Sequence, residues 1–524
     1  MSAAALAAAT VAPPLDTVAG HLPVLPMLVP LAAGALLLVL HRAPMLVKRA
    51  IAFAAALAMA LAVAALALGV ERLGIMVYQI GNWPSFAGIV FVADRLAVLM
   101  LGLLAVLALA ALAFATGDDD RRGPHFHALF QLQLFGLAGA FLTHDLFNLF
   151  VFFEVLLAAS YGLLLHGQGG ERLRQGMHYV VLNLVASALF LLAVGVLYGA
   201  LGTLNLSDLS ARVAALPAEA RPLVMAGALL LLLVFALKAA LLPLYFWLPR
   251  TYAAASAPAA ILFAIMTKLG VYAVLRVTLL VFGVEGFGEP LRAVLFWAGA
   301  GTVALAALGA LAAARLRDLA GYLVVGSAGV LFMALGYGSI ESVATALYYL
   351  AQSTLAMAAL FLLADWVRRQ RRGGDSLVRA EPMARAGLLG GLFAVLAVAA
   401  AGLPPLPGFL AKALLLAHAE PSGRGAVLWT VVLAASLVNV IALSRAGSRL
   451  FWQQPPVAST LAPPAPRFGE RFGLLVLLAA LLAATLFAAP LVDYAGGSAA
   501  QLADPASYRD AVLGLQPLPT TVPR

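Results

Sequence analysis

Apolar stretches of about 20 residues recur along almost the whole chain, and they constrain its fold more than any other feature. A helix of that length crosses the hydrocarbon core of a bilayer, which is about 30 Å thick. The alternation of apolar and polar residues that is typical of membrane barrels is absent, so the spans should be helices. Only 10% of the residues are charged, against about a quarter in soluble domains. We therefore expect an all-α polytopic membrane protein.

The apolar stretches predict about fourteen transmembrane helices. They are expected at residues 22–40, 50–70, 96–116, 125–142, 145–166, 177–200, 222–245, 257–283, 291–314, 319–338, 341–364, 385–418, 425–447 and 471–496. The twelfth stretch is too long and too rich in proline for one straight helix, so we expect it to be broken.

Basic residues in the links between these spans follow an alternating pattern. Twenty lie in odd-numbered links and six in even-numbered links. Because cytoplasmic links carry an excess of lysine and arginine, we predict that the odd-numbered links are cytoplasmic and that both termini lie on the outer, periplasmic face. The same topology accounts for the net charge of +9, and no nucleic-acid-binding motif accompanies it.

The composition also excludes several kinds of chemistry. There is no cysteine, which excludes disulfides and cysteine-ligated iron–sulfur clusters within this chain. The eight histidines show no metal-ligand spacing, and the pair His125 and His127 is expected at the start of a helix. The N-terminus has no basic segment, so we expect no cleaved signal peptide. We expect neither a cofactor nor a metal ion.

Lysine is used at unusual places in this chain. Of 32 basic residues only four are lysines, and Lys238, Lys268 and Lys412 lie inside apolar spans. A charge at the bilayer centre costs about 2.5–3.5 kcal/mol on insertion scales. Arginine stays protonated in proteins, whereas a buried lysine can release its proton. We interpret the three buried lysines as proton-translocating groups; the alternative is that they are structural or snorkelling charges.

Two of these lysines lie beside predicted breaks in their spans. Pro243 lacks an N–H and its ring clashes with the carbonyl of Ala239, so the helix of Lys238 should break there. A proline cluster that includes Pro405 comes just before Lys412. The lysine precedes one break and follows the other, which is the pattern of an inverted repeat with discontinuous helices 7 and 12. Ordinary proline kinks are the alternative.

The remaining candidates also lie inside or at the ends of spans. Lys268 follows Pro258 by ten residues, which places it about 15 Å along its helix, near the midplane. Glu154 is the only carboxylate well inside a predicted span, and a carboxylate in lipid needs a cation, so we predict that it pairs with Lys238. Asp145 is expected to be a helix N-cap or an acid at the mouth of a proton path. Smaller polar residues such as Gln352 could support a hydrated path or bond neighbouring helices.

Several segments carry a family resemblance. They are HDLFNLFVFFEVLLAASYGLL (144–164), FALKAALLPLYFWLP (235–249), YAAASAPAAILFAIMTKLGVYAVLR (252–276), ALYYLAQSTLAMAALFLLAD (346–365), SRAGSRLFW (444–452) and GNWPSFAGIVFVADRLAVLM (81–100). Together they resemble the D-type subunit of the Mrp-type multisubunit cation/proton antiporters, which are related to the antiporter-like proton-pumping subunits of respiratory complex I.

The resemblance implies a fourteen-helix fold with two inverted five-helix repeats and a hydrated central axis. By resemblance, Glu154 and Lys238 form a proton-gating pair, Lys268 is the central relay and Lys412 is the far-side lysine. Two positions depart from the pattern. His144 stands where relatives have glycine, and Gln352 stands where relatives often have histidine, so water would have to replace a titratable side chain there.

The implied organisation divides the chain into six parts. They are an outer N-terminal segment (1–21), the first three helices (22–116), a first repeat of helices 4–8 (125–283), a second repeat of helices 9–13 (291–447), helix 14 (471–496) and a polar C-terminal tail (497–524) with at most one short interfacial helix.

The resemblance implies a proton-translocating subunit of a monovalent cation (Na⁺ or K⁺)/proton antiporter in the plasma membrane. It is then a secondary transporter subunit and not an enzyme, and its partners are a large A-type subunit, small membrane subunits, lipid, protons and the cation. The alternatives are the proton-pumping subunit of a complex I-like dehydrogenase or membrane-bound hydrogenase, and a non-transporting scaffold.

Overall fold

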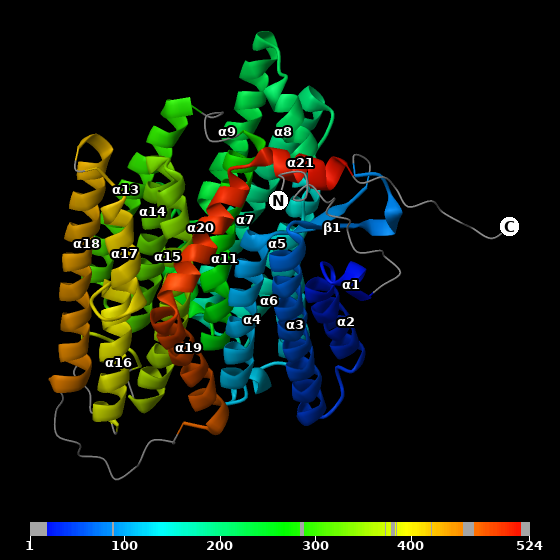
Figure 1. The fold of residues 1–524 in the computed structure, drawn as a ribbon. Helices are drawn as coiled ribbons and strands as arrows, with labels where there is room; N and C mark the ends of the chain where they lie inside the picture. The colour runs from blue at the N-terminus through cyan, green and yellow to red at the C-terminus, as the bar shows by residue number, and fades with distance from the viewer. Residues whose placement is uncertain are drawn as a thin grey trace.

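The computed structural model describes residues 18–85, 88–282, 288–371, 374–378, 383, 385–420, 422–453 and 466–514. In this part of the chain the long helices run side by side in one bundle (Figure 1). Most of the predicted N-terminal segment 1–21 and the end of the tail 497–524 lie outside the described residues.

The N-terminal half of the described chain contains the first broken helix and ends in a π-helical turn. Its elements are α1 (Val18–His21), α2 (Leu25–Val39), α3 (Met45–Leu73), β1 (Met76–Gln79), η2 (Ile80–Asn82), β2 (Val90–Ala93), α4 (Arg95–Ala115), η3 (Asp119–Arg121), α5 (Phe126–Leu142), α6 (Leu146–Leu165), α7 (Gly170–Leu201), α8 (Leu206–Ala214), η4 (Ala218–Ala220), α9 (Arg221–Lys238), α10 (Leu248–Ala254), α11 (Ala257–Leu275) and η5 (Arg276–Val281).

The C-terminal half contains a long buried helix and a second broken one. Its elements are α13 (Gly288–Ala312), α14 (Leu316–Tyr337), α15 (Ile340–Gln370), α16 (Ala386–Ala401), α17 (Pro407–Ala417), α18 (Gly423–Gly447), η6 (Ser448–Trp452), α19 (Phe468–Leu486), α20 (Ala488–Leu502) and α21 (Pro505–Leu513).

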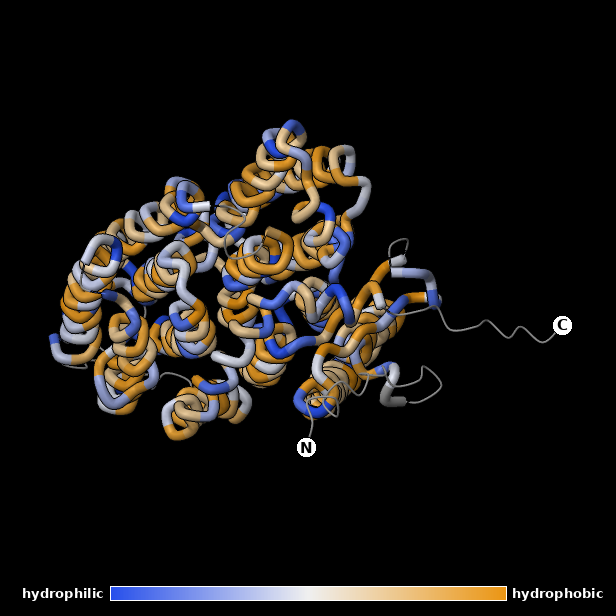
Figure 2. Tube along the Cα trace, turned by 45° about the horizontal axis from the view of Figure 1, so that its top comes forward, coloured by the Kyte–Doolittle hydropathy of each residue, from blue (hydrophilic) through white to orange (hydrophobic). Residues whose placement is uncertain are grey.

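Eleven helices of the described part are long and apolar enough to cross a membrane, and four shorter apolar helices accompany them. Figure 2 shows hydrophobic residues along most of the helices and hydrophilic ones at many of the turns between them. The predicted all-helical membrane fold is therefore confirmed, and the twelfth stretch is broken into α16 and α17 as expected.

Several boundaries differ from the sequence-based expectation. The helix expected at 222–245 ends at Lys238, and the chain is non-helical until α10. The span expected at 471–496 is divided between α19 and α20, and the supposed tail continues as helix to Leu502 before α21 packs against the bundle. The link after α3 forms a two-stranded antiparallel hairpin, in which Met76 pairs with Ala93. Such short strands lack the apolar length that marks a span.

Three helices form the centre of the bundle. In their most apolar stretches α11 with η5 is 100% buried, α15 is 94% buried and α14 is 89% buried. By contrast, the corresponding stretch of α18, at one edge of the bundle, is only 28% buried (Figure 1). The central helices must therefore satisfy their polar side chains within the protein, whereas the edge helices leave apolar side chains for lipid or partner chains.

One end of the bundle is defined here as the arginine-rich end, because Arg49, Arg122, Arg315, Arg369 and Arg467 lie there on the first turns, last turns or links of their helices. Ion pairs connect these segments to one another. This end corresponds to odd-numbered links of the predicted topology and lies at the bottom of Figure 1.

Candidate functional site

The first break in the bundle places Lys238 at the end of a half-helix. Residues between α9 and α10 leave the helical conformation beginning with Ala240, whose φ is +56°, and the peptide bond before Pro243 is cis. The indole N–H of Trp247 donates to the carbonyl of Leu237 at 3.2 Å. This carbonyl also accepts from the backbone N–H of Ala240 at 3.1 Å, so two donors bond it at the end of the half-helix.

Lys238 is buried, and its ammonium has no hydrogen-bond partner among the described residues. The Nζ atom lies 4.7 Å from the ring centre of Phe153, a cation–π contact. The next residue, Glu154, accepts a hydrogen bond from the hydroxyl of Ser187. No ion pair of the described part joins Glu154 to Lys238, although their charges attract each other. A direct pair between them stays a prediction.

A small cavity of about 10 Å³ adjoins Lys238, and Tyr252 and Met266 contribute to its walls. Such a volume is about the space of one water molecule. Tyr252 forms a hydrogen bond of 2.8 Å with the hydroxyl of Thr267, the residue before Lys268. The cavity therefore brings the surroundings of the first lysine close to the helix of the second.

Lys268 lies on the fully buried helix α11, and 1% of it is exposed. Its ammonium donates to the hydroxyl of Ser327 on α14, which in turn donates to the carbonyl of Val324. The helix approaches the first break closely, since a Cβ at Gly270 would lie only 2.7 Å from the backbone nitrogen of Ala239. Lys268 is therefore buried within the protein, and its predicted position near the bilayer midplane stays a prediction.

The second break places Lys412 in the first turns of the half-helix α17. Its ammonium donates to the carbonyl of Ala401, at the end of α16, and to the hydroxyl of Ser436, both at 2.8 Å. Gly402 makes the turn with φ +78°, and a Cβ there would lie 2.8 Å from Cδ of Lys412. The chain between the half-helices contains the cis peptide bond before Pro405. A carbonyl at the end of a half-helix thus holds a cation.

A cavity of about 30 Å³ adjoins Lys412 and the hydroxyl to which Lys268 donates. Ser327, the partner of Lys268, and Lys412 itself both line it, together with Gln352. The side-chain carbonyl of Gln352 is buried and has no partner in the described part of the chain. A polar cavity of this size has room for about two water molecules. One cavity with a partly polar lining therefore contacts both Lys412 and the hydroxyl partner of Lys268.

The candidates near the span ends have structural contacts. Asp145 caps α6 by accepting from the backbone N–H of Asn148 at 2.8 Å, and burial raises its pKa above the ordinary value. His144 forms a 2.8 Å hydrogen bond with Ser207 and stacks on the ring of Tyr508. Burial, with the nearby charge of Arg276, lowers the pKa of His144 to about 3, so the imidazole is neutral.

Sequence reasoning missed a buried ion pair at the opposite end of the bundle from the arginine-rich end. Arg276 donates to both carboxylate oxygens of Asp94, at 2.5 and 2.6 Å, and the hydroxyl of Tyr508 donates to the same carboxylate. Burial raises the pKa of Asp94, but the charge and hydrogen bonds of Arg276 outweigh it, so the pKa of the carboxyl remains below its usual range. The available signal was Arg276 itself, a charge inside the span expected at 257–283, but its partners are 182 and 232 residues away.

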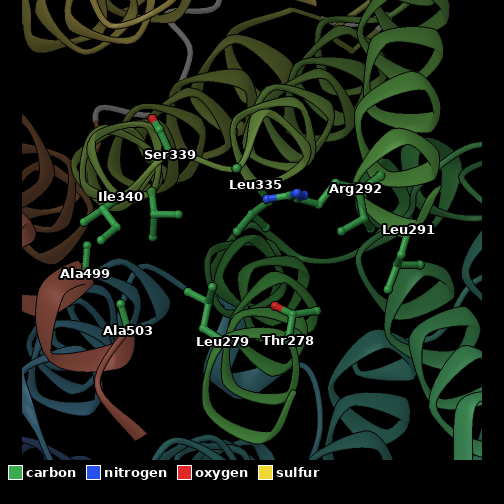
Figure 3. A pocket seen from close by; sticks show the side chains of 12 residues that line it. Thr278, Leu279, Leu291, Arg292, Leu335, Ser339, Ile340, Ala499 and Ala503 are labelled. Carbon is green, nitrogen blue, oxygen red and sulfur yellow. The ribbon is translucent and has the colours of Figure 1, made fainter. Parts of the chain in front are cut away.

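A separate apolar pocket lies at this same end, and Figure 3 shows Arg292 among its leucine and alanine side chains. Its volume is about 40 Å³, and none of its lining residues also lines the cavities beside Lys238 and Lys412. This pocket is therefore not part of the lysine site.

Comparison with known proteins places the site in a family. Residues 143–439, which include both breaks and all three lysines of the site, match the family described as NADH:quinone oxidoreductase/Mrp antiporter, transmembrane. The chain belongs to this family. It is a multi-pass membrane protein, and the matched segment runs from the start of α6 into α18.

Relatives and a solved structure agree with the resemblance to the D-type antiporter subunits. A probable K⁺/H⁺ antiporter D subunit of Rhizobium meliloti is 42% identical, over 94% of this chain and 97% of the relative. A Na⁺/H⁺ antiporter D subunit of Alkalihalophilus pseudofirmus is 35% identical, over 94% and 99%. The Mrp complex of a Dietzia species contains a chain with a TM-score of 0.86 and 26% identity, covering 94% of this chain and 99% of that one.

Proposed function

We propose that this chain is the D-type subunit of a multisubunit antiporter and that it carries protons in exchange for Na⁺ or K⁺. The observation that supports this most is the polar cavity that touches both Lys412 and the hydroxyl partner of Lys268. Protons cross a bilayer only along groups that bind and release them, or along water between such groups. A lysine that lines this space, and a second lysine that donates to a hydroxyl lining it, meet this requirement.

The proposed path has three lysine stations. A proton bound near Glu154 passes to Lys238, which lies at the end of α9 and beside a small cavity. Lys268 receives it within the fully buried α11 and passes it through the cavity beside Gln352. Lys412 then releases the proton beyond the second break, between α16 and α17. Water supplies the proton connection where Gln352 has no titratable group.

We further propose fourteen membrane spans. The eleven long apolar helices are completed by α2, by α5, and by α16 and α17 counted as one broken span. Helices 4–8 (125–283) and 9–13 (291–447) form the inverted repeats, which the two breaks on opposite sides of their lysines support. Both termini lie on the outer face, and the arginine-rich end faces the cytoplasm.

The assembled complex in everted membrane vesicles tests this proposal. The gene cluster is expressed in cells that lack their own antiporters, and dissipation of the pH gradient is followed after addition of Na⁺ or K⁺. Glu154→Ala, Lys238→Ala and Lys412→Ala are compared with wild type at equal amounts of assembled complex. We expect each variant to lose exchange. Normal exchange in all three would mean that these residues are structural, and the scaffold alternative would then stand.

A further inference from the structure

A cavity with a volume of about 330 Å³ lies at the arginine-rich end of the bundle. Its walls are the link between α4 and α5, the end of α15, and the starts of α16 and α19. Sites for small ligands have volumes of about 300–1,000 Å³. The cavity does not include any of the buried lysines, so the proposed proton path leaves it unexplained.

The charges around the cavity favour an anion. Its charged lining consists of four arginines and two carboxylates, namely Arg122, Arg369, Arg385, Arg467, Asp118 and Glu470.

The arginines differ in how far protein carboxylates already satisfy them. Arg369 pairs with Asp119 at 2.9 Å, with Asp365 at 2.6 Å and with Glu470. Among the described residues, Arg467 has only a long pair of 3.9 Å, to Asp118 of the cavity wall. Arg385 makes no ion pair with any residue that the structure describes. The cavity therefore holds guanidinium groups whose donors can bind a further anion.

Trp366 supplies an independent observation. It lines the cavity, it is 6% exposed, and its indole N–H has no acceptor among the described residues. A buried donor without an acceptor costs free energy, so native proteins rarely leave one unmatched. An oxygen-rich ligand in the cavity would provide the acceptor. The first turn of α16 also borders the cavity, and the positive end of a helix dipole favours an anion.

The residues around the cavity indicate that the ligand also has an apolar part. Leu388 lines it and is 58% exposed, and Phe468, directly after Arg467, is 82% exposed. Apolar side chains that a membrane protein leaves exposed are available to hydrocarbon or to partner chains. The cavity thus combines arginines with an apolar rim, which matches a phosphate group attached to acyl chains.

We propose that this cavity binds a phosphate group and that the headgroup of an anionic membrane phospholipid supplies it. Arg385 and Arg467 contact the phosphate oxygens, and the indole N–H of Trp366 donates to the bound ligand. The acyl chains lie against Leu388. Because the ligand bridges α15, α16 and α19, its binding stabilises the arginine-rich end of the bundle.

The test uses the purified complex stripped of lipid in a neutral detergent. Short-chain phosphatidylglycerol, short-chain phosphatidylcholine and inorganic phosphate are titrated separately, and the melting temperature and the bound ligand are measured. Variants are Arg385→Gln and Trp366→Phe. The matched control is Arg449→Gln, which removes an exposed arginine on η6 that does not line the cavity.

We expect saturable stabilisation by phosphatidylglycerol in wild type and in Arg449→Gln, and an affinity weaker by about tenfold in Arg385→Gln. Trp366→Phe should also weaken the affinity for phosphatidylglycerol. Arg385→Lys replaces Arg385→Gln in this test if the glutamine variant fails to assemble. Inorganic phosphate could instead bind more weakly to the cavity variants than to wild type, without being displaced by phosphatidylglycerol. That result would support the phosphate site and contradict a lipid as the source of the phosphate. Equal binding in wild type and both cavity variants would overturn the proposal.

Discussion

Each lysine of the proposed path has a different set of neighbours, and none of the three is held by an ion pair in the described part of the chain. Lys238 contacts an aromatic ring, Lys268 a single hydroxyl, and Lys412 a carbonyl and a hydroxyl. A carboxylate in direct contact would fix the proton on its lysine. Neutral partners accept a hydrogen bond from the ammonium without fixing its charge, which suits a group that has to bind and release protons.

Gln352 provides a test of the polar space between two of these lysines. Gln352→Leu should slow exchange by about tenfold, because an apolar wall favours a dry cavity. Gln352→His keeps the wall polar and adds a titratable ring, so exchange should persist with a new pH dependence near the ordinary histidine pKa of about 6.5. Initial rates of cation-induced proton movement in vesicles, measured across pH, check both. Wild-type rates in the leucine variant would contradict the proposed path.

We expect Asp119 to make the stability of the protein depend on pH. Burial, and then the charge of Asp365, raise the pKa of Asp119 to about 6, against about 3.9 in an unfolded chain. Between these two values the folded protein holds a proton that the unfolded chain has lost, so stability falls as pH rises from about 4 to 6.

Asp119→Asn should therefore flatten the melting temperature between about pH 4 and 6, because asparagine does not titrate. Melting curves of the purified complex at a series of pH values measure this. Asp510→Asn, at an exposed carboxylate, is the control and should keep the wild-type slope. An unchanged slope in Asp119→Asn would show that other groups cause it.

At the scale of elements, the two breaks could be read from the sequence because proline acts locally. Pro243 and the prolines around Pro405 remove backbone donors within a few residues of their lysines, so their effect needs no tertiary knowledge. How the breaks are stabilised could not be read in the same way. The bond from Trp247 to Leu237 depends on the path of the chain after the break.

The ion pair of Asp94 and Arg276 fixes the π-helical end of the central helix to the start of α4. Arg276→Gln leaves the carboxylate buried without its cation and should lower the free energy of unfolding by about 3–5 kcal/mol. The double variant with Asp94→Asn removes both charges and should lose less than Arg276→Gln alone. Thermal melting of the two variants checks this order. A double variant that is less stable than the single one would contradict it.

At the scale of the whole molecule, composition and periodicity predicted the membrane class and the helical fold, because burial in lipid acts on every residue of a span. They did not predict that Tyr508, in the supposed tail, contributes to a buried network with Asp94. Their separation of 414 residues has no local signature. The sequence did predict the pairing of Glu154 with Lys238, but no ion pair of the described residues joins them, so it stays a prediction.

The central claim is that the buried lysines move protons because they titrate. The most direct measurement is cation/proton exchange in vesicles containing the complex with Lys268→Arg, which keeps the charge but puts it on a group that stays protonated in proteins. Lys48→Arg, at the fourth lysine in the first turn of α3, is the control. We predict that exchange falls by about 100-fold in Lys268→Arg and is unchanged in Lys48→Arg, at equal assembly. Wild-type exchange in Lys268→Arg would contradict the account.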